Sequence, residues 1–197
     1  MNEKYRGIPY ITIGIIIINV VYFIVLNVKG AVGSTAAMVN YGASVPPLDI
    51  QGEYYRLFTS AFMHFDVMHI VNNMVMLYFV GVYIEEALGR WKYLLCYLLC
   101  AVGGNLVSNF YYMWRRELVV AAGASGAVFG LAGALAYIII RNKGHYRDLT
   151  IQRMIIFLAL CVYSGVANNG VNNAAHVGGL ITGFLAAALL YRRKKDV

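Results

Sequence analysis

The sequence is short of charged residues. They make up 13% of its 197 residues, whereas hydrophobic residues make up 60%. Soluble domains are roughly half apolar and about a quarter charged, so this composition predicts an integral membrane protein, and the length of its apolar runs predicts an all-α, polytopic one. The net charge of +7 does not indicate a nucleic-acid-binding protein, because the basic residues lie between apolar runs and form no basic face.

Cysteine and recognisable cofactor motifs are also scarce. Cys96, Cys100 and Cys161 lie inside apolar runs, at spacings that match no metal site and no disulfide framework. The sequence has no H-E-x-x-H zinc motif, no phosphate-binding loop, no dinucleotide fingerprint and no pair of membrane carboxylates suited to an aspartyl protease. We therefore expect neither a metal nor a cofactor.

Long apolar runs are abundant. Because a bilayer core needs about 20 helical residues, they predict six transmembrane helices within one domain, residues 1–197. The first run is too long for the apolar part of a signal peptide and lacks an A-x-A-like exit. The runs are residues 9–28, 63–84, 91–113, 124–140, 151–168 and 173–191, and residues 29–62 form a long outer loop.

The basic residues predict the orientation of the helices. With the N-terminus in the cytoplasm, the inner segments hold Lys4, Arg6, Arg90, Lys92, Arg141, Lys143, Arg147, Arg153, Arg192, Arg193, Lys194 and Lys195, twelve of the sixteen Lys and Arg. The outer segments hold Lys29, Arg56, Arg115 and Arg116. The positive-inside rule therefore places both termini on the inner side of a cytoplasmic membrane.

Polar side chains gather in alternate apolar runs, where they are costly and indicate function. The second run carries His64, Asp66, His69, Asn72 and Asn73, the fourth carries Ser125, and the sixth carries Asn172, Asn173 and His176. All three runs cross from outside to inside in the predicted topology. His69, Ser125 and His176 then fall at one depth, about 5–12 Å below the outer surface at ~1.5 Å per residue. This agreement predicts one shared site.

Ser125 stands in the small-residue stretch "AAGASGAVFGLAG". One interpretation is purely structural, because a serine at a helix start is usually an N-cap and spaced glycines usually allow close helix packing. The other is that a glycine-lined contact between the fourth and sixth runs brings Ser125 to His176. The glycines available for that contact are Gly126, Gly130 and Gly133 in the fourth run and Gly179 and Gly183 in the sixth.

A serine hydroxyl becomes a nucleophile when a base takes its proton, and histidine is the usual base. No acidic residue lies deep in the fourth or sixth run, so we expect a Ser–His dyad, with Phe129 as a ring against which the imidazole rests. His69 and Asn73 share a helix face and are candidate donors to an oxyanion, with Asn72 as the alternative for Asn73. Interhelical hydrogen bonding alone is the competing role for these donors.

Together these residues resemble the rhomboid family of intramembrane serine proteases. The G-x-S-G motif appears as Gly123 to Gly126, and A-H-x-x-G-x-x-x-G appears as Ala175 to Gly183. The second-helix motif appears as "MHFDVMHIVNNM". The resemblance spans essentially the whole chain and implies a six-transmembrane-helix rhomboid-like bundle.

The resemblance also implies residue roles and substrates. Ser125 would be the nucleophile and His176 the base, with His69, Asn73 and Gly123 supporting the oxyanion. The pairs Tyr55-Arg56 and Glu85–Gly89 would be structural. Substrates would be single-pass membrane proteins in the lipid bilayer, admitted past a lateral gate (the fifth helix) and a cap (residues 164–173).

Two positions depart from the family pattern. Ser60 stands where many relatives carry histidine, and Phe129 stands where many carry tyrosine. Phenylalanine keeps the ring surface but lacks the hydroxyl, so we expect both departures to alter stability or rate and not to remove activity.

Two other function classes compete with the protease. A catalytically silent rhomboid-like protein that binds membrane clients usually lacks the serine or the histidine, and this chain has both. A channel or transporter needs a polar path across the membrane, whereas the inner halves of the second, fourth and sixth runs are nearly all apolar. The sequence does not predict an oligomeric state.

Overall fold

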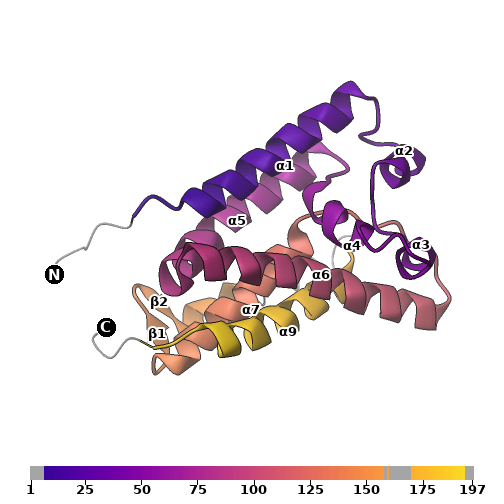
Figure 1. Ribbon diagram of the computed structural model, residues 1–197. Coiled ribbons are helices and arrows are strands. Elements are labelled where there is room, and N and C mark those ends of the chain that lie inside the picture. The colour runs from indigo at the N-terminus through magenta and orange to yellow at the C-terminus, as the bar shows by residue number, and fades with distance from the viewer. Residues whose placement is uncertain (1–6, 158, 160–169, 194–197) are drawn as a thin grey trace.

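The computed structural model describes residues 7–157, 159 and 170–193 as a helical bundle. Its long helices are α1 (Tyr10–Val28), α5 (Val67–Leu88), α6 (Arg90–Arg115), α7 (Ser125–Arg141) and α9 (Asn173–Leu190). α7 and α9 lie side by side against α6, and α1 packs on α5 (Figure 1). A small hairpin of β1 (His145–Tyr146) and β2 (Leu149–Thr150) lies at the same end of the bundle as the start of α1 and the end of α9.

Four of these helices, α1, α5, α6 and α9, are long and apolar enough to cross a membrane, and α7 is apolar but has 17 residues. The expectation of a polytopic all-α membrane protein is therefore confirmed, while the number of six spans is not established. Of the fifth predicted span, residues 151–157 are helical, and 158 and 160–168 lie outside the described residues. Most of the expected cap, 164–169, lies outside them as well.

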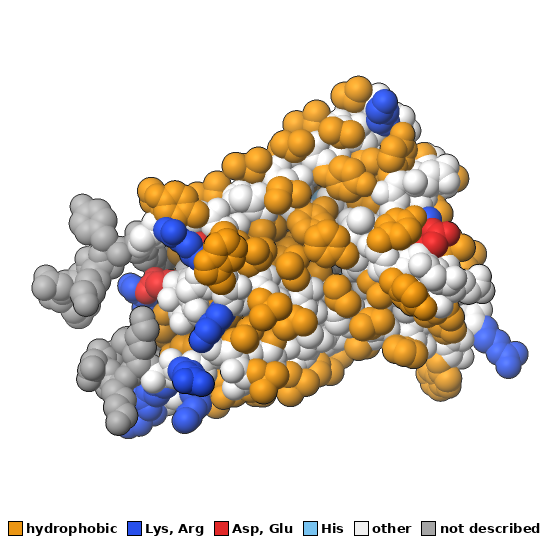
Figure 2. Space-filling view, in the orientation of Figure 1, with side chains coloured by type: hydrophobic (Ala, Val, Ile, Leu, Met, Phe, Trp, Pro, Cys, Tyr) orange, Lys and Arg blue, Asp and Glu red, His pale blue; other side chains and the backbone are white. Residues whose placement is uncertain are grey.

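The surface has the character of a membrane protein. Apolar side chains cover much of the visible face of the bundle, and lysines and arginines gather at the end where the hairpin and the end of α9 lie (Figure 2). The positive-inside rule predicts this distribution when that end faces the cytoplasm.

The second long helix begins later than the apolar run that predicted it. The run starts at residue 63, but α5 starts at Val67 because the side chain of Asp66 caps it, accepting a hydrogen bond from the N–H of His69 at 2.8 Å. His69 therefore lies in the first turn of α5 and not six residues into the helix. The helix ends at Gly89, whose φ of 79° favours glycine, and α6 follows at once.

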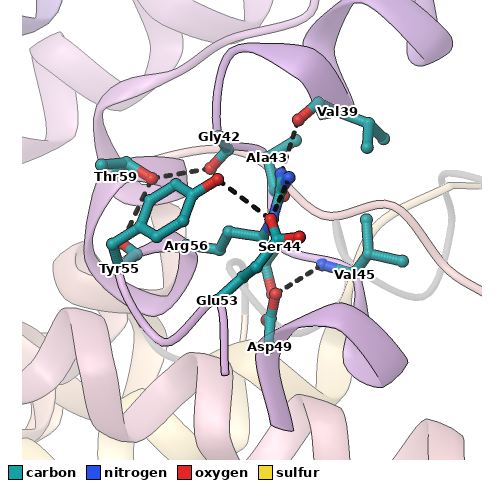
Figure 3. Close-up of polar contacts among 10 residues, drawn as sticks. All are labelled: Val39, Gly42, Ala43, Ser44, Val45, Asp49, Glu53, Tyr55, Arg56 and Thr59. Atoms are coloured by element: carbon teal, nitrogen blue, oxygen red, sulfur yellow. Dashed lines mark hydrogen bonds and ion pairs between the residues drawn. The ribbon is translucent and has the colours of Figure 1, made fainter. Parts of the chain in front are cut away.

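The outer loop folds into short helices: α2 (Thr35–Asn40), α3 (Pro46–Ile50), α4 (Arg56–Thr59) and the 3₁₀ turn η1 (Ser60–Phe62). Arg56 is 5% exposed and joins separate parts of this loop. Its guanidinium donates to the carbonyls of Val39 (2.5 Å) and Ala43 (3.0 Å) and pairs with Glu53 at 2.6 Å (Figure 3). The hydrogen bond from Arg56 lowers the pKa of Glu53 below its ordinary value.

Glu85 of α5 fixes the start of α1. Its carboxylate is buried and accepts hydrogen bonds from the N–H groups of Ile11 (3.0 Å) and Thr12 (2.8 Å) and from the Thr12 hydroxyl (2.8 Å). The first N–H groups of a helix have no partner within the helix, so a carboxylate from a neighbouring helix satisfies them.

α7 and α9 touch through their backbones. A Cβ on Gly183 would overlap the carbonyl oxygen of Gly130, and one on Gly179 would overlap that of Gly126. Small residues allow membrane helices this approach, which brings backbone against backbone. The largest fully buried side chains of the main hydrophobic core include Leu77, Tyr93, Tyr97, Leu131, Ile138 and Ile139.

The substitution Gly183→Ala tests the backbone contact. We expect it to lower the free energy of unfolding by about 1–3 kcal/mol, because the added methyl group meets backbone that cannot rotate away. Equilibrium unfolding in detergent micelles measures the loss. Gly14→Ala in α1 is the control, since no atom lies within 4 Å of its Cβ position. Alanine favours helix, so equal destabilisation by both substitutions would contradict the contact.

Candidate active site

Ser125 is the first residue of α7, and its hydroxyl does not cap the helix. The N-cap is Ala124, and no side-chain hydrogen bond caps α7. The side chain of Ser125 is half-buried. Ser125 is therefore not the N-cap of α7, as the structural interpretation would require.

His176 is held against α7 by an aromatic stack. It lies in the first turn of α9 and is 9% exposed. Its ring is parallel to that of Phe129, with 4.0 Å between centroids and 7° between planes. Phe129 follows Ser125 by four residues, so both lie on the same face of α7. The stack thus places the imidazole beside the face that carries the hydroxyl, although no hydrogen bond joins Ser125 to His176 among the described residues.

Gly123 brings His69 to the same place. Its φ is 139°, and a Cβ there would lie 2.8 Å from Nε2 of His69 and 3.7 Å from Oγ of Ser125. The ring of His69 and the hydroxyl of Ser125 therefore both border the Cα of Gly123. A side chain at this position would fill the space between them.

The two candidate asparagines of α5 differ in exposure. Asn73 is 7% exposed, and its side-chain amide donates to the carbonyl of His69 at 2.9 Å. Asn72 is exposed. The structure therefore brings Asn73 and not Asn72 beside His69, and one N–H of the Asn73 amide is engaged with the backbone of its own helix.

The segment that enters α7 is held by hydrogen bonds that no sequence pattern predicted. The N–H of Gly123 donates to the carbonyl of Ser60 at 2.9 Å, and the N–H of Ala124 donates to Nε2 of the fully buried His64 at 3.3 Å. Ala121 exchanges two backbone hydrogen bonds with Ser44, at 2.8 and 2.9 Å. The backbone before Ser125 is thus fixed at three successive points.

Sequence reasoning overlooked polar residues of the third predicted helix. Asn105, Ser108 and Asn109 lie in α6 and bond to the outer loop and to the start of α9. The signal was present, since these are polar residues in an apolar run.

Across residues 7–157, 159 and 170–193, no group of three His, Cys, Asp or Glu side chains is placed to hold a metal ion.

The comparison with protein families matches residues 51–193, which include His69, Asn73, Gly123, Ser125 and His176, to the Rhomboid domain. The chain belongs to the rhomboid family. Rhomboid homologues are intramembrane serine proteases, and the family also has catalytically inactive members.

Individual rhomboids match the chain over most of its length. It is 33% identical over 185 residues, 94% of the chain, to Rhomboid protease GluP of Bacillus subtilis. It is 29% identical over 202 residues, 91% of the chain, to Rhomboid protease AarA of Providencia stuartii. RHOMBOID-like protein 4 of Arabidopsis thaliana is 36% identical over 143 residues, 72% of the chain. The matches cover 36%, 72% and 35% of these relatives.

The substitution Gly123→Ala tests the contact between His69 and the Ser125 segment. We expect the reaction of Ser125 with a fluorophosphonate to slow at least about tenfold, because a methyl group displaces His69 or shifts the segment by tenths of an ångström to 1 Å. Gly52→Ala is the control. Gly52 has a similar φ of 120° with no atom within 4 Å, so it shares the backbone strain without the contact. Equal rates in the two variants would contradict this role of Gly123.

Proposed function

We propose that this rhomboid-family chain is an intramembrane serine endopeptidase. Ser125 is the nucleophile and His176 the general base of a Ser–His dyad. His69, Asn73 and the backbone around Gly123 and Ser125 support the oxyanion. The whole chain, residues 1–197, works as one membrane domain without a metal or cofactor.

The observation that carries the proposal is the stack of His176 on Phe129. It holds the imidazole against Phe129, which lies one helical turn from Ser125 on the same face of α7. A base must reach the proton that it abstracts, and hydrogen bonds of this kind are often long in an empty site and shorten when substrate binds. The half-buried hydroxyl makes no capping bond that would compete with the base.

The reaction proceeds through an acyl-enzyme. Oγ of Ser125 attacks the scissile carbonyl carbon while His176 takes the hydroxyl proton, which forms a C–O bond and a tetrahedral oxyanion. The intermediate collapses by breaking the C–N bond, and His176 gives its proton to the leaving amine. Water then attacks the ester carbonyl, with His176 again as base, and the second tetrahedral intermediate collapses by breaking the C–Oγ bond. Ser125 takes the proton back from His176, and the second product leaves as a carboxylic acid.

Stabilisation of the oxyanion comes from three directions. The N-terminus of α7 supplies backbone N–H groups and the positive end of the helix dipole. Nε2 of His69 borders Gly123, next to Ser125. The second N–H of the Asn73 amide remains available after the first has bonded to the His69 carbonyl.

The proposed substrates are single-pass membrane proteins, cut near the outer end of the membrane-spanning segment. The chain lies in the cytoplasmic membrane with both termini in the cytoplasm, which agrees with the basic end of the bundle (Figure 2). The starts of α5, α7 and α9 lie at the opposite end (Figure 1). The fifth predicted helix and residues 164–173 act as gate and cap.

A silent, client-binding rhomboid-like protein is the second candidate. One observation favours it: the described contacts contain no hydrogen bond between Ser125 and His176. Both candidates predict binding of membrane proteins, and only the protease predicts a reactive Ser125. Labelling by a fluorophosphonate therefore separates them.

The substitutions Ser125→Ala and His176→Ala test the dyad. We expect each to reduce cleavage of a reconstituted transmembrane substrate by at least about 10³-fold, because the reaction loses its nucleophile or its base. Cleavage is measured by gel in proteoliposomes, and the helical signal by circular dichroism should remain. His145→Ala is the control, since His145 is an exposed residue of the hairpin. Full turnover in either dyad variant would overturn the proposal.

A further inference from the structure

We propose that α6, which supplies no catalytic group, is the positioning scaffold of the site: Asn105 and Asn109 hold the segment that enters Ser125, and Ser108 holds the start of the helix that carries His176. The inference rests on the proposed function. The three residues are spaced i, i+3 and i+4 and so lie on one face of α6. That helix contacts α3, α4 and α9.

Asn105 supports Gly123 through Ser60. Its side-chain amide donates to the carbonyl of Leu57 at 2.7 Å and to the hydroxyl of Ser60 at 2.9 Å. The carbonyl of Ser60 in turn accepts the N–H of Gly123 at 2.9 Å. Two hydrogen bonds through one residue, Ser60, thus link α6 to the backbone two positions before Ser125.

Asn109 supports Ala121 through Asp49 and Ser44. Its amide donates to the carboxylate of Asp49 at 2.7 Å, and the same carboxylate accepts the Ser44 hydroxyl at 2.5 Å and the Val45 N–H at 3.0 Å. All of these groups are buried. Ser44 in turn pairs with Ala121 through two backbone hydrogen bonds. This chain of hydrogen bonds from α6, which we call an arm, therefore fixes the backbone four residues before Ser125.

Ser108 supports the other half of the dyad. Its hydroxyl is buried and accepts a hydrogen bond from the side-chain amide of Asn172 at 2.7 Å. The oxygen of the same amide accepts the N–H of Ala175 at 3.0 Å, which caps α9 one residue before His176. One face of α6 therefore sets the position of both reacting groups.

Such arms are suited to positioning because their hydrogen-bond partners are few and directional. A buried carbonyl or carboxylate that loses its donor costs about 1–3 kcal/mol, so each arm strongly favours one geometry. A displacement of about 1 Å between reacting groups costs about 10²-fold in rate. Loss of an arm should therefore reduce kcat and leave KM unchanged, since the substrate-binding surface stays intact.

The test compares Asn105→Leu with Asn142→Leu in the full chain in micelles. Asn142 is a matched control: like Asn105, its amide donates two hydrogen bonds that are at least partly buried, to the Ile138 carbonyl (2.7 Å) and the Tyr191 hydroxyl (2.8 Å), but at the far end of α7. We expect similar losses of Tm in both. Only Asn105→Leu should slow fluorophosphonate labelling of Ser125, by about tenfold to a hundredfold, and lower kcat without changing KM.

Hydrogen exchange gives a readout that does not need activity. Asn105→Leu should speed exchange of the amides at 121–124 and not of those at 173–178, and Ser108→Ala should do the reverse. Adding Ser60→Ala to Asn105→Leu should cause little further loss, because both act through one arm.

The outcomes separate the two proposals. A wild-type chain that never labels at Ser125 defeats the proposed function, while the exchange pattern still decides on the scaffold. Equal labelling rates in Asn105→Leu and Asn142→Leu, or unchanged exchange at 121–124 in Asn105→Leu, would overturn the scaffold.

Discussion

The contact between the backbones of α7 and α9 is the constraint on which the rest of the site depends. Lipid tails are as apolar as leucine, so burial of apolar side chains does not by itself drive two membrane helices together. Close packing does, and here glycines on both helices remove the side chains that would separate them. The contact sets the register of the helices, and with it the position of His176 relative to Phe129. A shift by one turn would carry the imidazole past that ring.

The second constraint is that polar groups at the ends of the helices take partners from other elements. Glu85 serves the start of α1, Asn172 caps α9 while bonded to α6, and Arg56 serves the carbonyls of the outer loop. In an apolar environment such groups have little water to bond to, so each one ties two segments together. Residues 29–62 are consequently tied together by Arg56 as α1 and α9 are tied to their neighbours by Glu85 and Asn172.

The sequence predicted the fold where hydropathy decides it. The runs 91–113 and 124–140 correspond to Arg90–Arg115 and Ser125–Arg141, because a bilayer requires a nearly fixed number of apolar residues. Hydropathy predicted too early a start for α5. The apolar run begins at residue 63, whereas the helix begins at Val67, after its cap Asp66. Hydropathy also could not reveal that Arg56 is buried among carbonyls. Helical periodicity favoured Asn73 over Asn72 as the partner of His69, whereas the role of Asn105 depends on a contact with residue 60 that no local pattern encodes.

On the proposed function, the absence of a carboxylate from the dyad explains why so much of the structure serves alignment. In a Ser–His–Asp triad, the carboxylate orients the imidazole directly. The acid nearest in sequence to His69, Asp66, caps α5 and bonds to the backbone of its own helix. The orientation of His176 must then come from its surroundings: the ring of Phe129 on one side, the cap of α9 behind it and the glycine contact with α7. Each of these is set by helix position, so a dyad of this kind requires a rigid bundle more than a triad does.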